Sequence, residues 1–154
     1  MIDAVSLKIL KILQNKARIP NVEVARQVGM APSAVLERIR KLEKQGFIDG
    51  YEVRLNPKRF ARSLVAFVRV KIKKLGDEKK TGESLSKIAE VQEVHYVAGE
   101  DAFLVKVRVA DTEDLGRLTR DKIAAIAAVQ STQTAIVLAT YKETARIPIE
   151  MVSA

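Results

Sequence analysis

The chain has 154 residues, a length that fits one domain or two small ones and is too short for a barrel enzyme. Hydrophobic residues make up 47% and charged residues 30%, which is typical of a folded globular protein rather than a disordered one. With no cysteine and one histidine, disulfides, thiolate nucleophiles and the usual zinc sites are excluded. The apolar stretches are too short for a membrane span. We therefore expect a soluble, cytoplasmic protein with no metal, no cofactor and no membrane contact.

The net charge of +8 is concentrated in the first part of the chain. Residues 1–60 carry 12 Lys+Arg and 6 Asp+Glu, whereas residues 61–154 carry 15 and 13. A local excess of this kind is typical of a protein that binds a polyanion such as DNA. The alternative is a basic surface that only keeps the protein soluble.

The apolar residues of the first 60 positions recur with a helical period. A first helix follows a cap at Asp3 or Ser6, and a second, shorter helix ends at Gly29. A third helix begins at Pro32, which suits a first turn, and Gly46 is placed to end it in the left-handed conformation. The apolar stripes of the three helices are Ile9, Leu10, Ile12 and Leu13; Val22, Val24, Ala25 and Val28; and Val35, Ile39 and Leu42.

After the third helix the pattern changes. Residues 47–55 predict a short strand or hairpin that turns at Asp49 and Gly50, and Asn56-Pro57 breaks it. From Ser63 onward the order is βαββαβ. Strands are predicted over 64–72, 91–97, 102–109 and 131–141, with a short helix over 83–89 and a longer one that starts at 111–114 and buries Leu115, Leu118, Ile123 and Ile126. This order predicts an α+β protein with a four-stranded antiparallel sheet and both helices on one face.

The second and third helices have the sequence form of a helix-turn-helix, whose second helix enters the DNA major groove. Ala25 allows the two helices to cross closely, Gly29 permits the turn, and Val35 packs back onto the preceding helix. The polar residues left on the other faces of the third helix are the predicted DNA contacts: Ser33, Glu37, Arg38, Arg40, Lys41 and Lys44. Arg and Lys neutralise phosphates or bond guanine edges, and a Ser at a helix N-terminus donates to a phosphate.

A solvated helix with i,i+4 charge pairs is the alternative interpretation of these residues. Glu37 and Lys41 fit it, but Arg40 and Lys44 repel one another at the same spacing, which favours the DNA interpretation. The basic residues of the following segment, Arg54, Lys58 and Arg59, fit either a wing that touches the DNA backbone or a basic linker.

The strand over 64–72 is apolar on both faces. Leu64, Ala66, Val68, Val70 and Ile72 lie on the face that the helices can bury. On the other face Val65 and Phe67, together with Leu104 and alternate residues of 135–139, would form an exposed apolar patch in a monomer. We therefore predict that Val65, Phe67 and Leu104 lie in a homodimer interface. The alternative is a sheet face covered by the tail 144–154.

No residue pattern in the chain predicts catalysis. His95 has no second His or Cys to share a metal, so a packed, hydrogen-bonded role is expected for it. The chain contains no Gly-rich phosphate loop and no nucleophile elbow. We expect a protein that is not an enzyme.

These segments resemble the Lrp/AsnC regulators. The resemblance rests on ILKILQNKARIP and VEVARQVGMAPSAVLERIRKLEKQGFIDGY in the first part and on VHYVAGEDAFLVKVRV and VQSTQTAIVL in the second, so it covers nearly the whole chain. It implies a transcription factor that binds double-stranded DNA through a (winged) helix-turn-helix. It also implies a ferredoxin-like domain that senses amino acids or related metabolites and builds homodimers, commonly assembled into octamers.

On this basis four regions are expected. Residues 1–50 form the helix-turn-helix domain and residues 51–62 form a hinge. Residues 63–142 form the ferredoxin-like domain for effector binding and oligomerisation, and residues 143–154 form a C-terminal tail.

The resemblance also places an effector site at the turn before the third strand, where related proteins show Gly-x-x-Asp, and at threonines entering the last strand. The residues at these positions are Gly99, Glu100, Asp101, Ala102, Thr132 and Thr134. Gly99 and the two threonines match, but Ala102 replaces the Asp. Because a carboxylate there can hold the ammonium group of an amino acid, its absence predicts weak binding of the common amino acids.

Two other functions share parts of this pattern. A siroheme decarboxylase-like enzyme has a similar two-domain architecture but needs basic and aromatic residues around a tetrapyrrole, and aromatics are only 5% of this chain. An architectural protein that compacts DNA would bind with little sequence preference, which the ratio of specific to non-specific affinity distinguishes.

Overall fold

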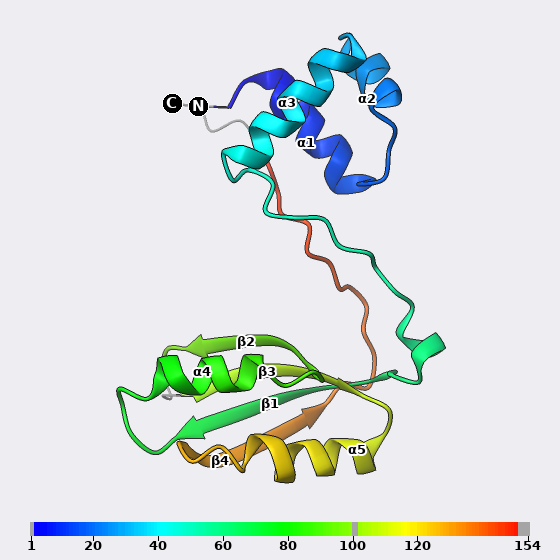
Figure 1. Cartoon of the computed structure of the whole chain (residues 1–154). Coiled ribbons are helices and arrows are strands. Elements are labelled where there is room, and N and C mark those ends of the chain that lie inside the picture. The colour runs from blue at the N-terminus through cyan, green and yellow to red at the C-terminus, as the bar shows by residue number, and fades with distance from the viewer. Residues whose placement is uncertain (1, 100–101, 151–154) are drawn as a thin grey trace. The chain divides into compact units, whose positions relative to one another are not determined.

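The computed structural model describes residues 2–99 and 102–150 (Figure 1). The chain divides into two compact units. The helical unit combines Met1–Arg54 with Glu143–Ala154, and the sheet unit is Leu55–Lys142. The helical unit is therefore built from two separate parts of the sequence.

The helical unit contains the three predicted helices, α1 (Ala4–Asn15), α2 (Asn21–Val28) and α3 (Pro32–Lys44). Of the two caps considered for α1, Asp3 is the one observed, since its carboxylate accepts from the backbone N of Ser6 at 2.7 Å. The turn between α2 and α3 begins at Gly29, whose φ of +72° is the left-handed conformation that favours glycine. The core of this unit is Ile9, Leu13, Val24, Ala25, Val35, Ile39 and Leu42. Val22, predicted in the apolar stripe of α2, is exposed instead.

The strand or hairpin predicted over 47–55 is wrong. Residues 48–56 have no regular secondary structure, and a short 3-10 helix, η1 (Pro57–Phe60), follows them. A strand needs a neighbouring strand to pair its backbone, and within the described part of this chain none lies beside residues 48–56. The segment is tied to α3 by a side chain instead, because the Tyr51 hydroxyl donates to Glu43 at 2.9 Å.

The sheet unit has the predicted βαββαβ order. Its strands are β1 (Leu64–Ile72), β2 (Val91–Val97), β3 (Ala102–Val109) and β4 (Val129–Ile136), and its helices are α4 (Glu78–Ser86) and α5 (Thr112–Arg117), which continues as a π-helical turn, η2 (Leu118–Ile123). The strands form one antiparallel sheet in the order β2-β3-β1-β4. Leu85 of α4 and Leu115 of α5 share one core with Val68 and Val105 of the sheet, so both helices cover the same face. The predicted fold is confirmed.

Three predicted boundaries in the sheet unit are wrong. The short helix expected over 83–89 spans Glu78–Ser86, and the last strand stops at Ile136 instead of Tyr141. Val137 still donates to the carbonyl of Val65 at 2.9 Å, but β1 begins at Leu64, so in this antiparallel register it offers no partner to residues after Leu138. The helix from Thr112 loses its α-helical pattern after Arg117, although Leu118 and Ile123 are buried as predicted.

The C-terminal tail, residues 144–154, which was considered as an alternative cover for the sheet, belongs to the helical unit. Its described part contacts α1 through a two-way hydrogen bond between the Gln14 amide and the backbone of Ile147. The Gln14 Nε2 donates to the carbonyl of Ile147 at 2.9 Å, and the N–H of Ile147 donates to Gln14 Oε1 at 3.0 Å. These two hydrogen bonds join the described part of the tail to α1.

Candidate nucleic-acid interface and ligand groove

Five of the six polar residues predicted on α3 lie together on its outward face. Val35, Ile39 and Leu42 face the core of the helical unit. The opposite face carries Ser33, Glu37, Arg40, Lys41 and Lys44, all of them exposed. Among the described residues, none of these five side chains takes part in a hydrogen bond or ion pair, so the charge pairing proposed for a solvated helix is not observed. The face is basic and open to a ligand.

The N-terminus of α3 is open as well. The cap residue, Ala31, supplies no side-chain hydrogen bond, and Pro32 occupies the first turn. The first backbone N–H groups of a helix have no partner within the helix and attract anions. Ser33, exposed in this turn, adds a hydroxyl donor. Phosphate oxygens are the ligands that such a helix end accepts.

Arg38 is separated from the other five. It lies one turn from both Val35 and Leu42, so its side chain points to the flank of the core and is only 33% exposed. Its Nη1 donates to Asp3 Oδ2 at 2.5 Å and to Ser6 Oγ at 3.0 Å. The guanidinium therefore joins α3 to the start of α1 and does not point outward with Arg40 and Lys41.

The C-terminal end of α3 has a second side-chain contact, the hydrogen bond from Tyr51 to Glu43. Partial burial and the Glu43 carboxylate raise the pKa of the Tyr51 hydroxyl to about 12. The basic residues Arg54, Lys58 and Arg59 follow in exposed backbone and in η1. Of these, Arg54 ends the first part of the helical unit, and the other two belong to the sheet unit.

The face of the sheet opposite the helices, here called the free face, carries the residues predicted for a dimer interface. Phe67 and Leu104 are half-buried on it. The expectation that Val65 is exposed is wrong, because its side chain is only 7% exposed within the single chain. An apolar surface remains at Phe67 and Leu104 even so.

The free face also contains an ion-paired group at its centre. Lys106 is 8% exposed and donates to Glu93 at 2.9 Å, and the His95 ring lies 3.2 Å from the same carboxylate. The Lys106 ammonium, and then His95, hold the pKa of the Glu93 carboxyl below its usual range. The hydrogen bond expected for His95 is present, but the packed position is not, since its side chain is 60% exposed.

The predicted effector threonines line a groove between α5 and β4. This groove has a volume of about 500 Å³, and its walls are Thr112, Leu115, Gly116, Thr119, Arg120, Ala124, Thr132, Thr134 and Ile136. The hydroxyl of Thr119 is buried and has no partner among the described residues. A buried hydroxyl without a partner costs free energy, so an incoming polar group gains by bonding to it. The sequence reasoning missed Thr119 and Arg120, because a regular helix period gives no sign of the π-helical turn that carries them.

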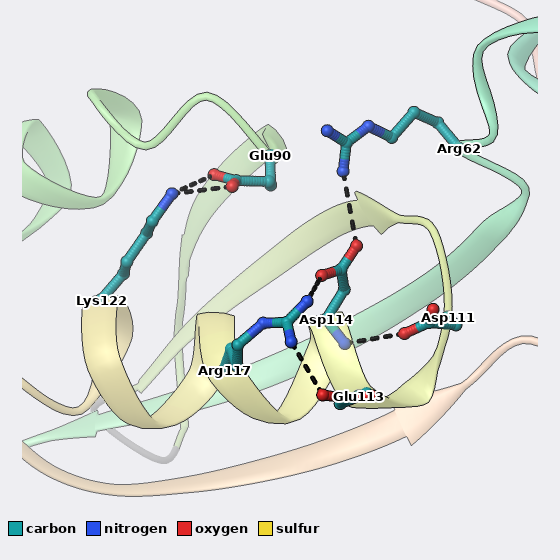
Figure 2. A network of polar contacts seen from close by, with 7 residues as sticks. All are labelled: Arg62, Glu90, Asp111, Glu113, Asp114, Arg117 and Lys122. Atoms are coloured by element: carbon teal, nitrogen blue, oxygen red, sulfur yellow. Dashed lines mark hydrogen bonds and ion pairs between the residues drawn. The ribbon is translucent and has the colours of Figure 1, made fainter.

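A network of ion pairs holds α5, the helical wall of this groove (Figure 2). Arg117 pairs with Asp114 and Glu113, and Asp114 also lies 3.8 Å from Arg62, at the entry to β1. At the far end of η2, Lys122 donates to both oxygens of Glu90 at 2.7 and 2.9 Å. The Arg117 guanidinium lowers the pKa of Asp114, and the Lys122 ammonium lowers that of Glu90. The groove wall is thus fixed to the sheet from both ends.

The structure does not bring the predicted effector residues together in one chain. Ala102 is paired with Lys71, whereas Thr132 is paired with Val70, so the two lie on opposite faces of the sheet. Ala102 is also only 3% exposed. Gly99 lies in the turn after β2 and has a φ of +109°. Glu100 and Asp101 lie outside the described residues.

Two features that other functions would need are absent from the described residues. No group of three or more histidine, aspartate or glutamate side chains in this part of the chain is placed to hold a metal ion. No helix in the described ranges is long and apolar enough to cross a membrane.

Comparison with known protein families matches both units. Residues 2–49 match the winged helix-turn-helix DNA-binding domain, and residues 65–147 match the Lrp/AsnC ligand binding domain. Among curated proteins, the leucine-responsive regulatory protein of Klebsiella pneumoniae is 34% identical over 151 residues, which cover 97% of this chain and 92% of that protein. The HTH-type transcriptional regulator FL11 of Pyrococcus horikoshii is 37% identical over 97% of both chains.

Solved structures agree with these matches. A transcriptional regulator of Neisseria meningitidis, determined in complex with L-Met, superposes with a TM-score of 0.90 at 31% identity and covers 96% of this chain and 97% of its own. The AsnC protein of E. coli gives a TM-score of 0.87 at 28% identity, over 96% of this chain and 99% of its own. Both comparisons extend over the two units together.

Proposed function

Because the chain belongs to the Lrp/AsnC family of transcriptional regulators, with a DNA-binding helix-turn-helix and a ligand-binding domain, we propose that α3 is the helix that reads its operator. The observation that carries this proposal is the outward face of α3, where five polar residues have no partner among the described residues. Arg40, Lys41 and Lys44 supply charge for phosphates and donors for guanine edges, and Ser33 lies at the open helix end.

We propose further that the sheet unit binds a small metabolite, with Thr132 and Thr134 as ligands in the groove beside α5. The groove, its buried Thr119 hydroxyl and the relative solved with L-Met support an effector of amino-acid size. Ala102 lies on the other face of the sheet, so a site that uses both this residue and the two threonines needs a second subunit to bring them together.

The second subunit is a copy of the same chain, and Phe67 and Leu104 on the free face are the residues that we propose at the dimer interface. Both are half-buried apolar side chains beside the ion pair of Glu93 and Lys106, and burial of such a patch is a common basis of symmetric dimers. Further assembly of dimers into octamers follows from the family resemblance.

Selection of genomic DNA fragments at physiological salt tests the proposed function. We expect a pseudo-palindromic operator with half-sites about one helical turn, ~34 Å, or a multiple apart, since a symmetric dimer presents two copies of α3. Affinity for the selected fragment should exceed affinity for random duplex by at least ~10³-fold at the same salt concentration. Equal affinity for both would show an architectural, DNA-compacting protein instead.

We propose that the chain has no catalytic role. Its relatives are named transcriptional regulators, and the groove beside α5 is lined by threonines and small or aliphatic residues, with one arginine and no aromatic side chain. This groove therefore lacks the basic and aromatic lining that a siroheme decarboxylase-like enzyme needs around a tetrapyrrole. Addition of siroheme to the purified protein should leave the absorbance of the tetrapyrrole unchanged, and a shifted spectrum would reopen the enzyme hypothesis.

A further inference from the structure

A cluster of three polar residues joins the start of α1 to the middle of α3. The two carboxylate oxygens of Asp3 serve different helices: Oδ1 accepts from the backbone N of Ser6 at 2.7 Å, and Oδ2 accepts from Arg38 at 2.5 Å. The same Arg38 nitrogen donates to the Ser6 hydroxyl at 3.0 Å, and Ser6 is buried. One aspartate therefore caps α1 and holds α3 at the same time.

We propose that Arg38 is a positioning residue for DNA recognition, which fixes α3 against α1 through Asp3 and Ser6 and does not itself contact DNA. This inference rests on the proposed function, in which the outward face of α3 reads the operator. It assigns Arg38 a different role from Arg40 and Lys41, its neighbours in the sequence.

The physical reason lies in the kind of contact that otherwise holds α3. Val35, Ile39 and Leu42 bury apolar side chains, and such burial is nearly non-directional, so it decides which face of the helix points inward but fixes the exact angle less sharply. A charge-assisted hydrogen bond has a defined length and direction. Since Arg40 and Lys41 follow Arg38 by two and three residues, a helix fixed at Arg38 presents both side chains to DNA at a fixed angle.

The electrostatics of Asp3 agree with this geometry. The Arg38 guanidinium, with help from the Ser6 donors, holds the pKa of the Asp3 carboxyl well below its usual range. Asp3 is therefore ionised at neutral pH and acts as a permanent acceptor for Arg38.

Four substitutions separate positioning from direct contact. Asp3→Asn removes the carboxylate but keeps the helix cap, because Asn is as good an N-cap as Asp. Arg38→Gln removes the other half of the pair, and Arg40→Gln serves as the comparison for a residue that does contact DNA. Asp49→Asn is the matched control, since it makes the same charge change at an exposed carboxylate of the same unit outside the cluster.

The measurement is the dissociation constant for a fluorescein-labelled duplex of the fragment that the full-length protein selects, taken over a range of salt concentrations. Thermal melts followed by circular dichroism establish that every variant is folded at the assay temperature. We expect Asp3→Asn and Arg38→Gln each to weaken binding by about two- to fivefold, as for a partly exposed charged pair. We expect the double variant to be no weaker than the weaker single variant, because both substitutions break one contact.

The slope of log K against log salt distinguishes the two roles of arginine. Loss of a positioning residue should leave this slope unchanged, whereas Arg40→Gln should reduce it by roughly 0.9, the value for one lost phosphate contact. The direction of the Asp3→Asn effect is a second discriminator. If Arg38 contacted DNA, removal of Asp3 would free the guanidinium and strengthen binding.

Three results would overturn the proposal. A smaller salt slope for Arg38→Gln, with tighter binding by Asp3→Asn than by Asp49→Asn, would make Arg38 a DNA contact. Unchanged affinity in both cluster variants, with weaker binding by Arg40→Gln, would leave the cluster with a role in stability alone. If Arg40→Gln also bound as well as the wild type, the proposed function of α3 would fail with it, and that outcome is distinct from the first two.

Discussion

The helical unit presents its candidate interface on one face of one helix, whereas the sheet unit divides its candidate site between two faces of one sheet. Five residues of α3 come together through helical spacing alone, within residues 33–44. Ala102 and Thr132 have only β1 between their strands, yet the alternation of the strands turns them to opposite sides. The face of α3 lies within one chain, whereas the effector site that we propose for the sheet would need a second chain to bring its two parts together.

The largest expected effect comes from a substitution that disrupts the proposed homodimer. Phe67 lies opposite Lys106 across β1 and β3, so Phe67→Lys places two ammonium groups side by side on the free face. Phe67→Asp should be milder, because Lys106 can pair with the new carboxylate. We expect Phe67→Lys to reduce the mass measured by light scattering to that of the monomer. Operator affinity should then fall by about 10²-fold or more, since two half-sites are no longer bound together.

The control for this experiment is Leu75→Lys, at an exposed apolar residue in the turn after β1. It makes the same change in charge away from the free face and should leave the mass unchanged. An assembly that survives Phe67→Lys would show that the interface lies on another surface.

The second prediction tests whether the helical unit needs only its own helix face. Replacement of both Arg40 and Lys41 by Ala should weaken DNA binding and reduce the salt slope by roughly 1.8, which corresponds to two phosphate contacts. The oligomeric mass should not change. Lys11→Ala with Lys16→Ala removes the same charge from exposed positions at α1 and should have a much smaller effect on the slope. Equal slopes for the two double variants would argue against α3 as the DNA-reading helix.

The third prediction addresses the divided site. We expect calorimetry with the twenty amino acids to give no dissociation constant tighter than about 0.1 mM, roughly −5.5 kcal/mol, because Ala102 offers no acceptor for an ammonium group. Ala102→Asp should improve binding of at least one amino acid by ~1.5–3 kcal/mol, the contribution of a charge-assisted hydrogen bond. Lys71 is the cross-strand partner of this position and competes for the new carboxylate, so the gain should lie near the lower value.

Ala102→Asn is the matched control, since it has nearly the same shape without the charge and should give little of this gain. Micromolar binding by the unmodified protein would mean that Thr132, Thr134 and backbone groups hold the ligand without a carboxylate at this position.

The smallest effect concerns the Tyr51 to Glu43 hydrogen bond at the end of α3. The folded pKa of Tyr51 is raised to about 12, so its contribution to stability is complete below the ordinary pKa near 10 and is lost as the pH rises through 12. Because Tyr51 is half exposed, we expect less than ~1 kcal/mol from this contact. Tyr51→Phe should remove the highest step of the tyrosinate absorbance titration, and persistence of that step would assign it to another tyrosine.

The regular parts of both units could be predicted from the sequence because they depend on local periodicity. The strand over 64–72 and the helix–turn–helix are examples, since their apolar spacing and glycine positions decide them. The helix predicted over 83–89 begins earlier, at Glu78, and therefore contains Gly82 in its interior, where glycine is unfavourable by about 1 kcal/mol. The structure supplies the reason for that glycine, because a Cβ there would lie 3.3 Å from the Phe103 ring.

The parts that could not be predicted depend on partners far away in the sequence. Helical periodicity predicts that Arg38 lies with the other polar residues of α3. Nothing in the local sequence identifies Asp3, 35 positions earlier, as its hydrogen-bond acceptor. The end of β4 depends on where β1 begins, and the side to which Thr132 points depends on its pairing with Val70. Pairing across a sheet is a tertiary property. Residue types alone therefore do not predict on which face of the sheet each part of the proposed ligand site lies.

The hydrogen bonds between Gln14 and Ile147 have a consequence for how the protein is made. About 100 residues separate the end of α3 from Ile147, so a ribosome that adds ~5–20 residues per second needs roughly 5–20 s between them. During that interval the three helices have left the ribosome and the whole sheet unit is synthesised, while the partner of Gln14 does not yet exist. The unit that begins the chain is therefore completed after the unit that follows it, because the sheet unit is inserted between its two parts.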